Sequence, residues 1–108
     1  MLLPAIVMAQ QYPFYVEPAK NQVDSLRLIS KNTSNDTLRM TIFRDLGRYY
    51  LEIERDSTLY YSEQRLLLAK RLKLKLWEAD AFEVIGYVSI QSGNYPKSLQ
   101  ALLQALNN

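Results

Sequence analysis

The chain has 108 residues, and its thirteen Lys and Arg against eleven Asp and Glu give a formal charge of +2. This length accommodates one small domain, and so small a charge excess does not indicate a nucleic-acid partner. The sequence contains neither Cys nor His, which excludes disulfides, thiolate nucleophiles and the most common metal ligands. The usual catalytic residues are therefore largely absent, although a hydrolase could still use carboxylates or a Ser–Lys pair. We expect a non-catalytic protein with no metal and no cofactor.

Residues 1–18 form a leader that is apolar at first and then interrupted by proline. Its apolar run ends in Val7, Met8 and Ala9, which resembles the end of a secretory signal peptide. The positively charged start of such a signal is missing. We interpret the leader as a signal-peptide remnant, with a disordered leader as the alternative. No segment approaches the ~18 apolar residues of a membrane span.

The next part of the chain predicts two helices separated by a polar turn. The first helix is expected over residues 19–31, because apolar residues recur every three positions there. A cluster of turn-forming residues follows, in which Asp36 is a suitable N-cap for the next helix. That second helix is expected over residues 37–54.

Three more helices are predicted in the second half of the chain. The third begins after Asp56, its expected cap, and its end is basic. Residues 71–77 alternate like a strand, but we interpret them as one helix running into the next, since a lone strand is marginal. The fourth helix is expected over residues 75–92, ended by Gly93 in a left-handed conformation, and the fifth over residues 96–106.

A short pattern in the second helix recurs in the fourth, at an offset of 39 residues. It consists of an aromatic residue, an aliphatic residue and a glycine: Phe43, Leu46 and Gly47, then Phe82, Ile85 and Gly86. Helix pairs that repeat at such a period form stacked hairpins, because each hairpin buries its apolar face against its neighbours. The sequence therefore predicts an all-α protein, built of antiparallel helical hairpins stacked as an α-solenoid fragment.

The pattern resembles the tetratricopeptide repeat (TPR), whose first helix carries Trp-x2-Leu-Gly-x2-Tyr. Tyr50 completes this signature in the first copy, whereas Ser89 replaces the tyrosine in the second. Ser98 and Ala105 match the small residues of the second helix. The resemblance covers residues 38–108, and it implies that Gly47 and Gly86 let the paired helices approach closely.

The resemblance also implies a division of the chain and a place in a larger protein. A leading helix and turn span residues 19–35, and TPR-like hairpins span residues 36–74 and 75–108. The long period is similar to that of the N-terminal repeat arrays of bacterial sensor histidine kinases. We therefore expect a fragment of a longer signal-transduction protein, followed by further repeats, on the periplasmic side of a bacterium, with a cytoplasmic location as the alternative.

In TPR proteins the first helix of each hairpin lines a concave groove that receives a partner peptide. The resemblance places Arg44 and Arg48 in this groove as a basic strip, beside an acidic strip with Asp80, Glu83 and Tyr87. A competing interpretation is that these charges only pair with one another across adjacent repeats. The alternative function is a small all-α enzyme or regulator with superficial repeat similarity, and Asp80 with Glu83 would be its candidate acid and base.

Overall fold

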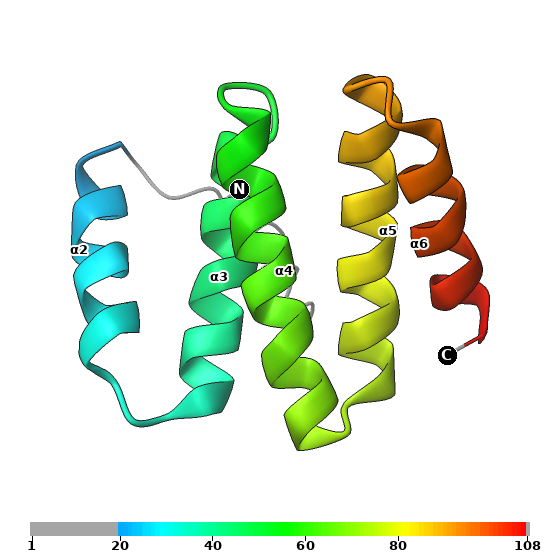
Figure 1. The fold of residues 1–108 in the computed structure, drawn as a ribbon. Helices are drawn as coiled ribbons and strands as arrows, with labels where there is room; N and C mark the ends of the chain where they lie inside the picture. Colours follow the sequence, from blue (N-terminus) through cyan, green and yellow to red (C-terminus); the bar gives the residue numbers. More distant parts are fainter. Residues whose placement is uncertain (1–19, 108) are drawn as a thin grey trace, which may run out of the picture.

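The computed structural model describes residues 20–107, and this part of the chain is helical without any strand. Its helices are α2 (Lys20–Asn32), α3 (Asp36–Tyr50), α4 (Arg55–Leu72), α5 (Lys75–Gln91) and α6 (Tyr95–Asn107). They stand side by side in chain order, each antiparallel to the one before (Figure 1). The close backbone approaches are between helices that are neighbours in sequence. The predicted all-α stack of hairpins is confirmed.

The helix starts differ from the sequence prediction in their capping residues. Asn35, not Asp36, caps α3, since the Asn35 side chain accepts a hydrogen bond of 3.0 Å from the backbone N–H of Leu38. Asp36 is the first residue of the helix, where its negative charge interacts favourably with the positive end of the helix dipole. The predicted cap Asp56 is also wrong, because Glu54 holds the N-cap position of α4 and makes no side-chain cap hydrogen bond.

Two left-handed residues end the longer helices. Lys73 has a φ of 58° and follows α4, and Gly93 has a φ of 80° and follows α5. The prediction for Gly93 is confirmed. Residues 71–77 are the end of one helix and the start of the next, as predicted, with only Lys73 and Leu74 between them. A lysine gives no sequence signal for this turn, because the left-handed conformation favours glycine.

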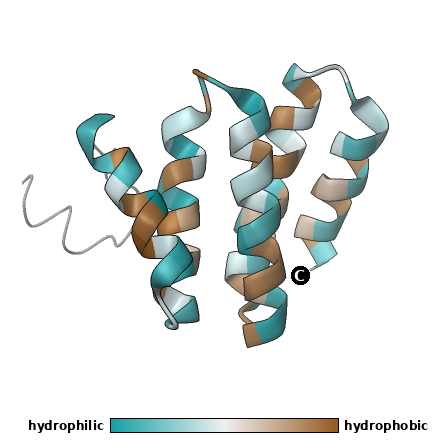
Figure 2. Ribbon diagram, turned by 60° about the vertical axis from the view of Figure 1, so that its left-hand side comes forward, coloured by the Kyte–Doolittle hydropathy of each residue, from teal (hydrophilic) through white to brown (hydrophobic). Residues whose placement is uncertain are grey.

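Buried apolar residues lie along the lines where neighbouring helices meet. One cluster joins α2 to α3 and consists of Val23, Ile42, Leu46 and Tyr50. A second joins α3 to α4 and consists of Met40, Leu68 and Ala69. In Figure 2 each helix carries both hydrophobic and hydrophilic residues, as expected for helices buried along one side.

The two repeat glycines have different surroundings. A Cβ added at Gly86 would lie 2.8 Å from Cδ2 of Leu102, whereas the nearest atom to a Cβ at Gly47 would be Cβ of Tyr61 at 3.7 Å. The expected close approach is therefore found at Gly86, where the Leu102 side chain would have to move to admit a Cβ, but not at Gly47. The reason is the facing helix, which presents the small Ser62 to Gly47 and the larger Leu102 to Gly86.

The leucines of α6 divide between the core and the surface. Leu102 is half-buried against α5, whereas Leu99, Leu103 and Leu106 are exposed by 61%, 49% and 82%. Ala101 is buried and brings α6 close to α5. Small residues therefore make much of this contact, and the leucine-rich face lies mostly outside it.

Candidate functional site

The faces of α3 and α5 border a hollow of about 440 Å³. It is lined by Gly47, Arg48, Leu51, Asp80, Glu83, Val84 and Tyr87. The residues from α5 share one face, because they are three or four positions apart. Four of the five predicted groove residues thus meet at one hollow. The fifth, Arg44, lines an adjoining hollow of about 160 Å³ together with Arg48 and Asp80. We refer to the two hollows together as the α3–α5 groove.

Asp80 is the centre of the charged network in this groove. Its carboxylate lies 3.8 Å from Nη2 of Arg48 and forms an ion pair with Arg65. The pairing of Arg48 with Asp80 crosses from one repeat to the next, as the competing interpretation of these charges expects. Glu83 makes no ion pair with another residue among 20–107, so this pairing does not account for every predicted charge.

Arg65 is the residue that the sequence analysis missed at this site. It extends from α4, its side chain is 2% exposed, and its Nε has no hydrogen-bond partner in the described part of the chain. Burial lowers the pKa of Arg65, and the hydrogen bond and charge of Asp80 oppose this shift. Spacing alone could have found it, because Arg65 falls on the buried stripe of α4 with Ser62 and Ala69.

Arg44 is held between an aromatic ring and a carboxylate. Its guanidinium carbon lies 5.2 Å from the ring centroid of Trp77, within the range of a cation–π interaction. Its Nε is 3.3 Å from the carboxylate of Asp45. Burial raises the pKa of Asp45, although the positive charge of Arg44 acts in the opposite direction. These contacts hold the Arg44 side chain against α5 at the edge of the groove.

The repeat-signature residues lie mainly in the interior. Leu46, Gly47, Tyr50, Ile85, Gly86 and Ser98 are buried, and Phe43, Phe82 and Ala105 are half-buried. The ring of Phe43 packs on that of Tyr61, with centroids 5.7 Å apart. These positions suit a structural role.

No group of three or more acidic residues in 20–107 is arranged to hold a metal ion, so Asp80 and Glu83 gain no third carboxylate. Among the same residues, no helix combines the length and the apolar character that a bilayer crossing needs. The predicted leader, residues 1–18, lies outside the described residues.

Comparison with known families agrees with the repeat architecture. The sequence model of the SusR N-terminal TPR domain matches residues 9–107, nearly the whole chain. The chain belongs to this TPR family. No curated protein and no solved structure shows a significant match. TPR domains are protein-interaction scaffolds and are generally non-catalytic, so the α3–α5 groove of this TPR domain is a candidate surface for a protein partner.

Proposed function

We propose that the α3–α5 groove of this TPR domain binds an extended or helical segment of a partner protein. The observation that carries the proposal is that Arg48, Asp80 and Tyr87 surround a hollow with apolar walls from Leu51 and Val84. Hollows with mostly apolar walls and a few polar groups are typical of binding sites. The membership of the chain in a family of interaction domains supports the same function.

The chemistry of the groove favours a segment that carries an acidic residue next to an apolar one. An acidic side chain would lie near Arg44 and Arg48, and an apolar side chain would pack between Leu51 and Val84. Tyr87 is 44% exposed, and its hydroxyl accepts a hydrogen bond of 2.7 Å from Nε2 of Gln91, which orients the ring. Tyrosine and arginine are among the residue types that most often dominate the binding energy of an interface, and the Arg44 and Arg48 side chains are 12% and 33% exposed.

The test is a double charge reversal, Arg44→Glu with Arg48→Glu. We expect at least about tenfold weaker binding at low salt to a partner isolated with the parent protein. The difference should be smaller at high salt, because salt screens the attraction between the groove and an acidic segment. The matched control is Lys31→Glu with Arg55→Glu, which makes the same change of net charge at exposed positions. Equal binding by both double variants, with helicity intact, would contradict the proposal.

We also infer that this domain is the N-terminal sensory part of a longer bacterial signal-transduction protein, such as a sensor histidine kinase, and lies outside the cytoplasm. The leader pattern supports export, and the matching family is described as an N-terminal domain. Alkaline phosphatase, which is active only after export, can be fused after residue 108 of the parent gene. We expect an active fusion. An inactive but full-length fusion would place the domain in the cytoplasm.

A further inference from the structure

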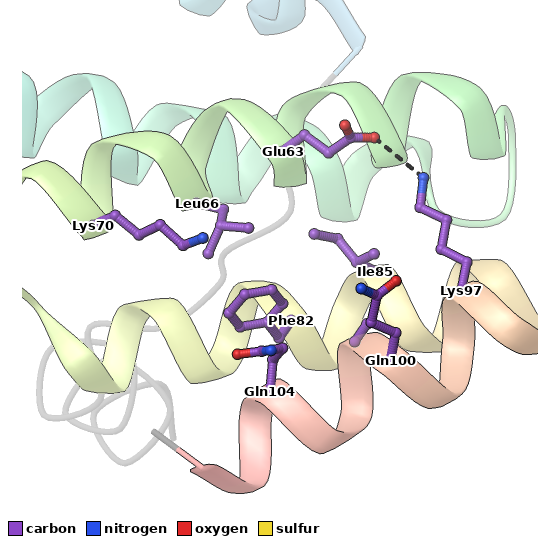
Figure 3. A pocket seen from close by; sticks show the side chains of 9 residues that line it. Glu63, Leu66, Lys70, Phe82, Ile85, Lys97, Gln100 and Gln104 are labelled. Carbon is purple, nitrogen blue, oxygen red and sulfur yellow. Dashed lines mark ion pairs between the residues drawn. The ribbon is translucent and has the colours of Figure 1, made fainter.

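Apart from the α3–α5 groove, a hollow of about 340 Å³ lies between α4 and α6, with α5 as its floor (Figure 3). Apolar residues form its base, namely Leu66, Phe82, Ile85 and Ala101. Polar and charged residues form its rim, namely Glu63, Lys70, Lys97, Gln100 and Gln104. We call this the α4–α6 hollow. Its volume falls within the about 300–1,000 Å³ of ligand-binding clefts.

The α4–α6 hollow is separate from the α3–α5 groove. At 100° per residue, Phe82 and Ile85 point about half a turn away from Asp80, Val84 and Tyr87. The α4–α6 hollow and the α3–α5 groove therefore lie on opposite faces of α5, and they share no lining residue. A substitution at the rim of one leaves the side chains of the other in place.

The charge of the rim favours an acidic ligand. Lys97 is already paired with Glu63, with Nζ and Oε1 3.7 Å apart, and this pair bridges α4 and α6 at one end of the hollow (Figure 3). Lys70 has no carboxylate within ion-pair distance among residues 20–107, and its Nζ lies 5.3 Å from the ring centroid of Phe82. The other end of the hollow therefore has an unneutralised ammonium group beside an aromatic surface.

Two glutamines on α6 supply hydrogen-bonding groups at a useful spacing. Gln100 and Gln104 are exposed, and neither side chain is hydrogen-bonded to another residue in the described part of the chain. They are one helical turn apart, which is a rise of about 6 Å, and alternate residues of an extended peptide are about 6.6–6.8 Å apart. Each amide can both donate and accept, as a peptide backbone requires. Figure 3 shows both side chains on the α6 side of the hollow.

We propose that the α4–α6 hollow is a second docking site, which binds an extended, acidic segment of a partner protein. Gln100 and Gln104 hydrogen-bond to its backbone at alternate residues. An apolar side chain of the segment packs on Phe82 and Leu66, and a carboxylate pairs with Lys70. The same α5 helix then carries a partner on each of its two open faces, so that one domain can join two proteins.

The experiment is a titration of the full chain with the blocked pentapeptide Glu-Leu-Glu-Phe-Glu, followed by ¹H–¹⁵N NMR. Titration to about 5 mM detects affinities near 1 mM. We expect the side-chain amide signals of Gln100 and Gln104 to shift, together with the backbone signal of Phe82. Lys70→Glu should weaken binding at least about tenfold by replacing attraction with repulsion. The matched control Lys31→Glu, at an exposed lysine on α2, should bind as the wild type does.

Several results would overturn the proposal. One is the absence of shifts at Gln100 and Gln104. Another is equal binding of a Lys-Leu-Lys-Phe-Lys peptide, or of the same acidic peptide by Lys70→Glu. Shifts confined to Arg48 and Tyr87 would place the peptide in the α3–α5 groove instead. Glutamine signals that depend on protein concentration without peptide would identify a second copy of the chain as the occupant.

Discussion

Replacing Asp80 with alanine is expected to destabilise the domain by about 2–4 kcal/mol, because the buried guanidinium of Arg65 then loses its carboxylate. Removing one partner of a fully buried pair costs about 3–5 kcal/mol. We place this pair somewhat lower, since the Asp80 side chain is 38% exposed and water reaches it. The measurement is urea unfolding followed by circular dichroism. Glu83→Ala, one turn further along α5 and exposed, is the control and should change stability by less than about 0.5 kcal/mol.

A double variant shows how much of the destabilisation comes from losing the ion pair between Arg65 and Asp80 and how much from losing the aspartate alone. In Arg65→Met with Asp80→Ala the buried charge is gone, and the methionine fills much of the same space. We expect this double variant to recover most of the lost stability, with a coupling energy between the two sites of about 1–3 kcal/mol. Strict additivity of the two single changes would show that Arg65 does not depend on Asp80.

Sequence reasoning predicted the helices of the stack because their apolar residues recur at a helical period. It also placed the turn at Gly93, because glycine readily adopts the left-handed conformation that ends a helix. The same reasoning placed a break between helices within residues 71–77, but it could not assign the left-handed conformation to Lys73, because lysine does not favour that conformation. There the left-handed conformation is set by two helices that must pack antiparallel.

The candidate groove was predicted in part, because the repeat alignment shows which residues share a helix face. Repeat alignment placed Arg48, Asp80 and Tyr87 on facing helices, and the structure brings them to one hollow. The alignment gave no role to Arg65, because the residue expected on a buried stripe is apolar, although the spacing of Arg65 places it on that stripe. The α4–α6 hollow was not predicted at all, since it depends on how three helices meet and on no single motif.

The equivalent glycines of the two repeats are expected to respond differently to the same substitution, with alanine less favourable at Gly86 than at Gly47. Gly47→Ala should leave stability unchanged or raise it by up to about 1 kcal/mol, because alanine favours the helix and its Cβ meets only ordinary contacts. Gly86→Ala should gain less or lose stability, since its Cβ would lie 2.8 Å from the Leu102 side chain, which must move. Gly86→Leu should cost about 3 kcal/mol, the upper range of over-packing.

Thermal and urea unfolding of the variants check this order, and the decisive comparison is the difference between the two alanine variants. Adding Leu102→Ala to Gly86→Ala removes the clashing side chain, so the alanine at Gly86 should then stabilise as it does at Gly47. If Gly86→Ala stabilised the domain as much as Gly47→Ala with Leu102 still present, the crossing of α5 and α6 would accommodate the added Cβ without a clash. The two hairpins would then pack alike, and the difference between Ser62 and Leu102 would have no effect on stability.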